Sequence, residues 1–274
     1  MTGNNLFLEI PTSDYQRIST LVAEFCGFSI DFMQREIIER RTQLYLKKIG
    51  LNLSAWINIL EKYPEKTTEY IDTICTGEQQ IFRDVSFWKV LFNNPERGFP
   101  TNAESRILFF DMPTGEDFFT WLILQKTYFP HLCPQIEITT PHTSGLNRIK
   151  HKKLVFQKIG SLQNQLSEPF EKVNLLEHLE EMHNTWQITD FSTFHPKIYL
   201  HKCIQPFPSG TFHTIFCRNR LLYYTEEICS VIISNLYRAI IPGGYLMTGT
   251  HDNPAQIISG GFTIIDKENG IYKK

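Results

Sequence analysis

The stretch Phe212–Tyr245, FHTIFCRNRLLYYTEEICSVIISNLYRAIIPGGY, decides the fold of this chain. It opens with an apolar strand that stops at a polar pair, Arg218-Asn219. An amphipathic helix follows, and a turn at Pro242-Gly243-Gly244 leads into a second apolar strand. This strand–helix–strand order is typical of a parallel sheet covered by helices. Because ligands bind at the carboxyl ends of the strands in such sheets, we expect the polar pair to form one wall of a site.

Composition and charge limit the class of protein. The hydrophobic fraction of 42% over 274 residues is enough for a real core, and the length allows one large domain or two modest ones. A net charge of −2, with scattered Lys and Arg, argues against a nucleic-acid binder, which usually has a basic face. The six cysteines form no CxxC pair, so we expect reduced thiols.

The N-terminus lacks the basic start and long apolar run of a signal peptide. No apolar run approaches the roughly 20 residues of a membrane span. We therefore expect a soluble, cytoplasmic protein without membrane insertion, and a monomer.

The first part of the chain shows only helical patterns, which predict a helical domain over residues 1–93, with the opening segment 1–12 packing elsewhere. The predicted helix starts are a capping box of Ser13 with Gln16, then Asp31 and Ser54 as further caps. Two more helices are predicted over 67–75 and 85–93. A linker over 94–101, with two prolines and a glycine, indicates a domain boundary.

Beyond the linker the pattern changes to strands and helices, which predicts an α/β domain over 102–274. A strand at 106–110, a helix at 118–127 and a strand at 135–139 make a βαβ unit. We expect an inserted subdomain at about 150–200, with a helix over Asn174–Met182 and strands at 185–188 and 197–200. Residues 261–265 and 270–272 are expected to form a closing hairpin.

Four motifs carry a resemblance to a known family. Cys217-Arg218-Asn219 with Leu221 and Tyr223 follows a CRN-x-L-x-Y pattern, and Pro242–Tyr245 follows PGGY. Glu78, Phe82 and Arg83 fit NET-x-FFR, and Thr114-Gly115-Glu116 fits STGEE. In this order and spacing, the sequence resembles the CheR-type chemotaxis methyltransferases over nearly its whole length.

The resemblance implies a fold, an activity and a partner. The fold would be a Rossmann-like class I methyltransferase domain, preceded by a helical domain and carrying a small inserted β-subdomain. The activity would be S-adenosylmethionine-dependent O-methylation of glutamate side chains on bacterial chemoreceptors. The cytoplasmic helices of the receptor would be the protein substrate, and a basic stretch from Glu39 to Lys48 would help to meet them.

The resemblance also implies site residues. Arg83 and Tyr223 correspond to catalytic positions, and Arg83, Gly115, Glu116, Arg218 and Asn219 correspond to cofactor-binding positions. Without the resemblance, these residues would be a surface arginine, a tyrosine under a loop, a helix-start carboxylate and strand-end turn residues. The chemistry needs no general base, because a free glutamate titrates near ~4.3 and is already ionised.

Several positions depart from the family pattern. Gly77 and Gln79 stand where Asn and Thr are usual, and Lys202-Cys203 replaces an Asn-Leu pair. Thr140 stands where the family carries an aspartate that holds the cofactor's ribose. Losing one charge-assisted hydrogen bond costs about 1.5–3 kcal/mol. That is roughly a ten- to hundredfold loss of affinity.

These departures leave two rivals to the enzyme. The first is a catalytically silent relative that acts as a binding or regulatory module. The second, a small-molecule or RNA methyltransferase on the same fold, gives no reason for the helical domain and finds no basic RNA-binding face. His178 and His183 lie five residues apart, on different faces of the expected helix, so we predict no metal site there.

Overall fold

The computed structural model describes residues 9–75, 80–94, 104–154, 158–168, 170–183, 185–189 and 194–274. Within these residues a seven-stranded sheet has the order β6-β2-β1-β7-β8-β10-β9. Its strands are β1 (Arg106–Phe109), β2 (Gln135–Thr140), β6 (Lys197–Leu200), β7 (Phe212–Cys217), β8 (Ile240–Thr248), β9 (Thr263–Asp266) and β10 (Ile271–Lys273). Neighbours are parallel from β6 to β8, and β10 runs antiparallel to both β8 and β9. The predicted Rossmann-like α/β fold is confirmed, and so is the closing hairpin.

The central strands are apolar because both of their faces are covered. On β7, Phe216 packs into one core cluster while the neighbouring Ile215 packs into the other. The Phe216 ring stacks on Phe109 of β1, with 4.7 Å between ring centroids, and lies 6.0 Å from Trp88. The short runs of apolar residues noted in the sequence are therefore the central, doubly covered strands.

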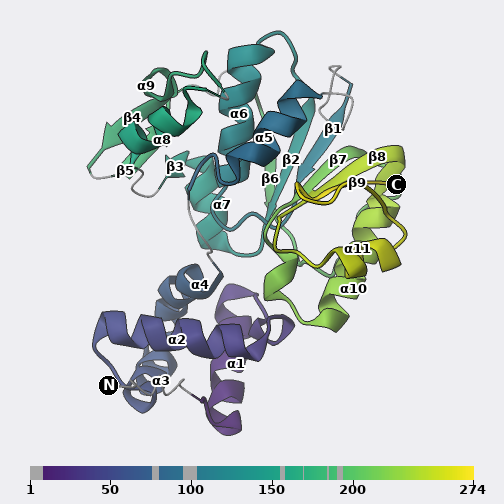
Figure 1. Ribbon diagram of the computed structural model, residues 1–274. Coiled ribbons are helices and arrows are strands. Elements are labelled where there is room, and N and C mark those ends of the chain that lie inside the picture. Colours follow the sequence, from purple (N-terminus) through teal and green to yellow (C-terminus); the bar gives the residue numbers. More distant parts are fainter. Residues whose placement is uncertain are drawn as a thin grey trace, which may run out of the picture.

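Helices cover the two faces of the sheet (Figure 1). One face carries α5 (Val85–Asn93), α6 (Glu116–Tyr128) and α7 (Thr143–Lys150), and the other carries α10 (Glu226–Ala239) and α11 (Pro254–Ser259). Helix α6 is buried along most of its length. Only a short loop joins β1, which ends at Phe109, to α6, which starts at Glu116. The start of α6 therefore lies near the carboxyl end of β1, where a ligand site is expected.

The first four helices of the chain gather at one end of the molecule (Figure 1). They are α1 (Thr12–Cys26), α2 (Arg35–Ile49), α3 (Leu53–Lys62) and α4 (Thr67–Cys75). Tyr45, Trp56 and Tyr70 form their aromatic centre, with ring centroids 4.5–5.7 Å apart. Helix α5 packs instead on the sheet, so the domain boundary at residue 93 stays a prediction. Most of the predicted linker 94–101 and of the opening segment lies outside the described residues.

The predicted helix starts at Ser13, Asp31 and Ser54 are wrong. Helix α1 follows Pro11 without a side-chain cap, and Asn52 caps α3 by accepting a hydrogen bond from the amide of Ala55. Asp31 lies in a short 3₁₀ turn, Ile30–Phe32, and its carboxylate accepts a hydrogen bond from Ser19 Oγ at 2.7 Å. Asp31 therefore binds Ser19 on α1 and does not cap α2, although the local sequence had predicted a cap.

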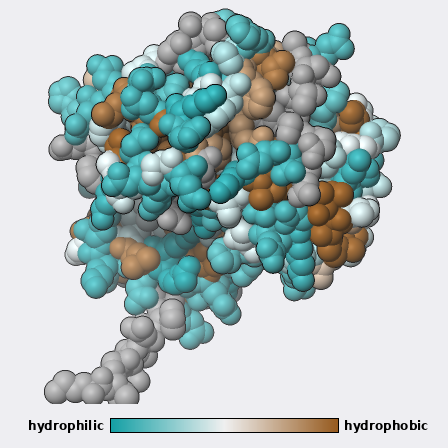
Figure 2. Space-filling model, turned by 45° about the horizontal axis from the view of Figure 1, so that its top comes forward, coloured by the Kyte–Doolittle hydropathy of each residue, from teal (hydrophilic) through white to brown (hydrophobic). Residues whose placement is uncertain are grey.

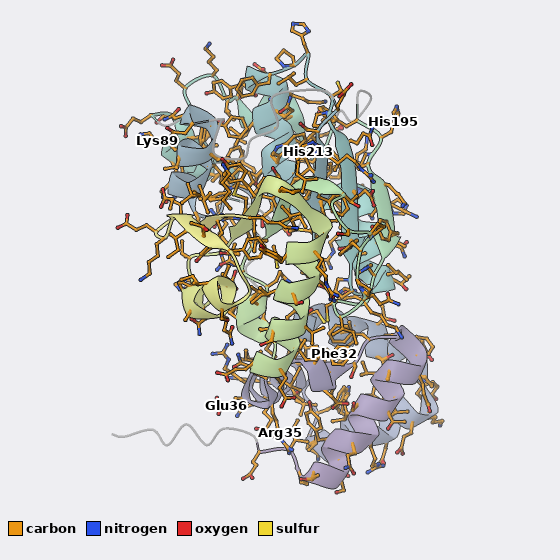
Figure 3. All side chains as sticks on the ribbon, turned by 90° about the vertical axis from the view of Figure 1, so that its right-hand side faces the viewer. Phe32, Arg35, Glu36, Lys89, His195 and His213 are labelled. Carbon is orange, nitrogen blue, oxygen red and sulfur yellow. The ribbon has the colours of Figure 1, made fainter. Side chains whose placement is uncertain are left out.

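The helical part meets the α/β part along the segment after β7. The amide of Gln34 donates to the carbonyl of Tyr223 at 2.9 Å, and the amide of Thr225 donates to the carbonyl of Phe32 at 3.0 Å. Figure 3 shows Phe32 at this junction, beside the α10 side of the sheet. The helices of the N-terminal part therefore hold the chain that carries Tyr223.

The insertion differs in part from its prediction. A small antiparallel sheet of β3 (Lys153–Leu154), β5 (Thr185–Ile188) and β4 (Leu179–Met182) packs with α8 (Ile159–Leu166). The predicted helix over Asn174–Met182 is wrong, because only α9 (Leu175–His178) is helical and the following residues pair with β5. Lys197–Leu200 is a strand, as predicted, but it pairs with β2 in the main sheet.

The surface in view is largely hydrophilic, with separate hydrophobic patches (Figure 2). Among the described residues, no helix is long and apolar enough to cross a membrane. The described residues also contain no group of three or more His, Cys, Asp or Glu side chains placed to hold a metal ion.

Gly145 permits the close approach of α7 to the end of β2. A Cβ atom at this position would clash with Thr140 Oγ1 and would lie 2.6 Å from the carbonyl oxygen of Pro113. We predict that Gly145→Ala lowers the free energy of unfolding by about 1–3 kcal/mol, because overpacking forces backbone shifts. Urea unfolding measures this.

Gly160→Ala, in α8, is the matched control, because a Cβ there meets nothing within 4 Å. Its unfolding free energy should stay unchanged or rise by about 0.5–1 kcal/mol. Equal stability of the two variants would contradict the packing described for α7.

Candidate active site

One small cavity lies at the carboxyl ends of β1 and β7. Its volume is about 50 Å³. Its lining includes five of the six predicted site residues: Arg83, Glu116, Arg218, Asn219 and Tyr223. The sixth, Gly115, precedes α6 with a left-handed φ of 92°. The roles assigned to these residues stay predictions, but the fold brings them together.

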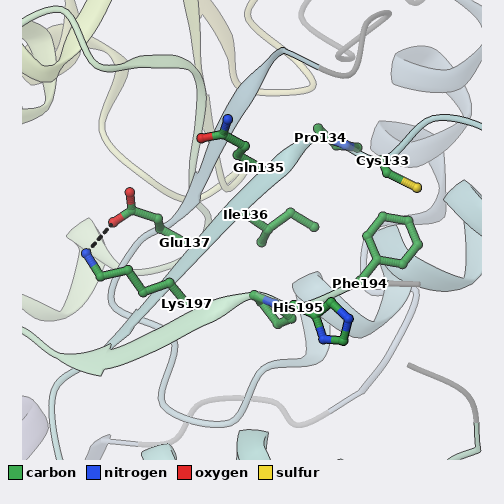
Figure 4. Close-up of a pocket in the computed structure, with 9 residues that line it drawn as sticks. Cys133, Pro134, Gln135, Ile136, Glu137, Phe194, His195 and Lys197 are labelled. Carbon is green, nitrogen blue, oxygen red and sulfur yellow. Dashed lines mark ion pairs between the residues drawn. The ribbon is translucent and has the colours of Figure 1, made fainter. Parts of the chain in front are cut away.

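A larger cavity of about 380 Å³ lies elsewhere, at the amino ends of β2 and β6 (Figure 4). Cys133, Phe194 and His195 line it, and Lys197 pairs with Glu137 at its edge, 3.6 Å apart. Ligands of open α/β sheets bind at the opposite, carboxyl ends of the strands. The small cavity is therefore the candidate active site.

Arg218 is a buried support of this site. Its guanidinium is fully buried and pairs with Asp84 at 2.9 Å and with Asp117 at 3.3 Å. It also lies 3.8 Å above the centroid of the Phe87 ring, a cation–π contact. Burial raises the pKa of the Asp117 carboxyl above its ordinary value, and the charge of Arg218 offsets only part of this rise. Arg218 thus joins the starts of α5 and α6 to the end of β7.

Asn219 adopts a left-handed backbone conformation, with a φ of 53°. The Asp252 carboxylate fixes this turn by accepting from the amides of Asn219 at 3.0 Å, Leu222 at 3.0 Å and Gly249 at 2.7 Å. Burial raises the pKa of Asp252 to about 6, although these amides lower it. Sequence reasoning missed Asp252, and its position just after β8, another carboxyl end, is the signal that could have found it.

Glu116 opens α6 and is buried. Thr114 Oγ1 donates a hydrogen bond to its Oε2. Burial raises the pKa of Glu116 to about 7. Within the described part of the chain, its Oε1 has no hydrogen-bond partner. A buried acceptor without a partner is costly, so this oxygen is suited to a ligand donor.

A second buried ion pair, which sequence reasoning missed, crosses the same rim. Arg220 Nε donates to Asp111 Oδ2 at 2.8 Å, and Arg220 Nη1 donates to the carbonyl of Cys75 at 3.0 Å. Tyr224 OH donates to the same Asp111 oxygen at 2.6 Å. Burial lowers the pKa of Arg220, but the Asp111 charge more than offsets this and raises it.

Tyr223 is buried between the two parts of the molecule. The guanidinium of Arg41, from α2, lies 4.4 Å from the centroid of its ring, and that of Arg220 lies 5.4 Å away. Arg41 also donates to the carbonyl of Ile74. Burial lowers the pKa of Arg41. This arginine, predicted as part of a basic receptor-facing surface, instead points inward to the site.

Thr140, which the resemblance predicts to replace a ribose-binding aspartate, is fully buried. Its Oγ1 donates to the carbonyl of His142 at 3.4 Å, and helix α7 begins directly after His142. Burial lowers the pKa of His142 to about 3, so its ring is neutral. The other departures at Gly77 and Gln79, together with Glu78, lie outside the described residues.

The lining suits a polar ligand, whereas the space does not suit a large one in this conformation. Buried atoms that lack partners in the described part of the chain include Glu116 Oε1, Asn219 Oδ1 and Arg218 Nη1. These atoms fit the hydroxyl, amine and carboxylate groups of a nucleoside amino acid. The volume of about 50 Å³ is far below the roughly 300–1,000 Å³ of typical ligand cavities. A ligand of that size therefore requires side chains to move.

Comparisons with known proteins agree with this arrangement. The chain is 25% identical over 266 residues to a chemotaxis protein methyltransferase of Borreliella burgdorferi, with 89% of each chain covered. It is 22% identical over 265 residues to the chemotaxis protein methyltransferase of Escherichia coli, covering 90% of this chain and 86% of that protein. No family model matches.

Solved structures were also compared. The [4+2]-cyclase SpnF is 12% identical and covers 70% of this chain and 62% of its own, with a TM-score of 0.40. A putative sarcosine dimethylglycine methyltransferase from Galdieria sulphuraria is 7% identical, covers 67% and 62%, and has a TM-score of 0.39. The sheet of the present chain has parallel neighbours from β6 to β8 and a reversed final hairpin.

The raised pKa of Glu116 predicts a pH-dependent stability. A carboxyl whose pKa is higher in the folded state stabilises the fold below its unfolded pKa of about 4.5, and this contribution is lost as the pH rises through about 7. We predict that Glu116→Gln and the wild type have similar stability at pH 5. At pH 8 the variant should be more stable by roughly 3 kcal/mol.

Urea unfolding of both proteins at the two pH values measures this difference. Glu137→Gln is the control, because the pKa of Glu137 is lowered and its hydrogen bonds favour the charged form. That variant should be less stable than the wild type at pH 8. A constant difference between wild type and Glu116→Gln across the pH range would contradict the assignment.

Proposed function

We propose, from the premise that the chain is a divergent CheR-type methyltransferase, that it transfers a methyl group from S-adenosylmethionine to glutamate side chains of chemoreceptors. The observation that supports this most is the cavity at the carboxyl rim, which gathers Arg83, Glu116, Asn219 and Tyr223. The likeness to relatives extends along almost the full chain and so includes the helical part.

The cofactor, when bound, supplies an electrophilic methyl group on a sulfonium. Of this chain's residues, Glu116 and Asn219 offer buried acceptor oxygens that lack partners in the described part of the chain. Gly115 turns the backbone into α6, which carries Glu116 and Asp117 at its start. These residues would bind and orient the cofactor.

Arg83 and Tyr223 would position the substrate. Arg83 lines the cavity, and its backbone carbonyl is held by Trp88 Nε1 at 3.0 Å. A guanidinium can hold a carboxylate through two hydrogen bonds, which fixes both its place and its orientation. The nucleophile is already ionised, so alignment and exclusion of water are the main tasks of the site.

The helical part would receive the receptor. Arg40, Lys47 and Lys48 are exposed on α2, although Lys48 lies 3.9 Å from Glu69, whereas Arg41 is turned towards Tyr223. An acidic receptor helix on this face would therefore lie close to the segment that holds Tyr223. We propose that the protein methylates receptors in the cytoplasm, as a soluble monomer.

A second candidate function is a catalytically silent binding module. The observation that favours it is the small volume of the cavity, together with the buried hydroxyl of Thr140 in place of a carboxylate. Calorimetry with S-adenosylhomocysteine separates the two candidates. Heat of binding at micromolar to millimolar ligand supports the enzyme, and no heat at millimolar ligand supports the silent module.

Arg83 provides a direct test of the proposed mechanism. We predict that Arg83→Ala lowers kcat/KM for methyl transfer to receptor-rich membranes on the order of 100-fold, because the carboxylate loses its alignment. Radiolabelled methyl incorporation measures this. Urea unfolding of the variant should match that of the wild type.

Arg17→Ala is the matched control, since Arg17 pairs with Glu61 on the surface of the helical part. Its transfer rate should equal that of the wild type. A normal rate for Arg83→Ala would remove Arg83 from the mechanism.

A further inference from the structure

The Asp111–Arg220 ion pair lies across the carboxyl rim of the sheet. Asp111 follows β1 and Arg220 follows the neighbouring β7. Their side chains are 1% and 4% exposed. The pair therefore fills the space directly above two adjacent strand ends, where an open α/β sheet holds its ligand.

The pair is held in place from several elements. Asp111 Oδ2 accepts from both Arg220 Nε and Tyr224 OH, and Arg220 also donates to the carbonyl of Cys75 at the end of α4. Asp111 itself has a left-handed φ of 56°. This arrangement ties the helical part, β1 and β7 together at one point.

Residues of the same group line two cavities. Arg220 lines the cavity of about 50 Å³ that contains Glu116 and Asn219. Tyr224, its partner through Asp111, lines a second cavity of about 150 Å³ with Pro141 and Lys202. Each volume alone is below the roughly 300 Å³ at the lower end of ligand cavities. Both volumes therefore border members of one hydrogen-bonded group.

A buried ion pair is weak evidence for a stabilising role. Replacing both members by neutral residues is often harmless or stabilising, because the desolvation cost of two charges disappears. Removing one member alone leaves a buried charge without its partner and is destabilising. The pair at this rim is therefore better explained as a barrier to a ligand than as a source of stability.

We propose that Asp111 and Arg220 form a plug that limits access of the cofactor to its crevice. This inference rests on the proposed use of S-adenosylmethionine and goes beyond it, because it assigns a role to residues outside the predicted site. In the closed state, the guanidinium of Arg220 divides the crevice, and a nucleoside-sized ligand binds only when this side chain moves away. Because Arg220 also bonds to the end of α4, the position of the helical part biases the opening.

The experiment compares the wild type with the double variant Asp111→Gly/Arg220→Leu. Glycine accepts the left-handed backbone at position 111, and leucine fills less of the crevice without a charge. Calorimetry with S-adenosylhomocysteine gives the dissociation constants, and urea unfolding checks that both proteins are folded. Arg220→Lys is the matched control, because it keeps the positive charge beside Asp111.

The plug predicts at least tenfold tighter binding by the double variant than by the wild type, and an affinity within about threefold of the wild type for Arg220→Lys. If the double variant does not fold, Asp111→Asn/Arg220→Gln replaces it, because this pair of changes also removes both charges and asparagine tolerates the left-handed backbone. It should bind at least threefold more tightly than the wild type.

Binding by the wild type with no gain in the double variant would overturn the plug and leave the proposed function intact. No binding by either protein would overturn the proposed cofactor as well. Binding by the double variant alone would support the plug.

Discussion

The buried guanidinium of Arg218 is the contact on which the candidate site depends. It is paired with Asp84 and Asp117 and packed against Phe87, so it fixes the end of β7 to the first residues of α5 and α6. Arg83 lies directly before Asp84, and Glu116 directly before Asp117. Two residues predicted to act on ligands are therefore each positioned by a neighbour that binds Arg218. The Cys217-Arg218-Asn219 motif therefore serves mainly to position Arg83 and Glu116.

The same rim contains two kinds of buried charge. Around Arg218 and Asp252, each charge supports a strand end or a turn and leaves a few polar atoms for a ligand. Around Arg220, by contrast, the charges pair with each other and fill the space between the strand ends. The predicted site residues and the Asp111–Arg220 pair thus share one edge of the sheet.

Much of the fold could be predicted from the sequence, because the central strands are short apolar runs and the βαβ pattern indicates a parallel sheet. The helices over 67–75 and 85–93 were also predicted, since the signals are local. Predictions failed where a distant partner decided the outcome: Asp31 bonds to Ser19, and residues 179–182 pair with β5. The Asp111–Arg220 pair was missed for the same reason, as its members are 109 positions apart. Sequence patterns identify strand ends, but only the assembled rim shows which charged residues there neutralise one another.

A crystal structure of the protein with S-adenosylhomocysteine would show whether the ligand occupies this rim and where Arg220 then lies. We expect the ligand to lie over the carboxyl ends of β1 and β7, in contact with Glu116 and Asn219, with the Arg220 side chain displaced from Asp111. A structure at saturating ligand in which Arg220 still bonds to Asp111, and the nucleoside is absent from this rim, would contradict this expectation.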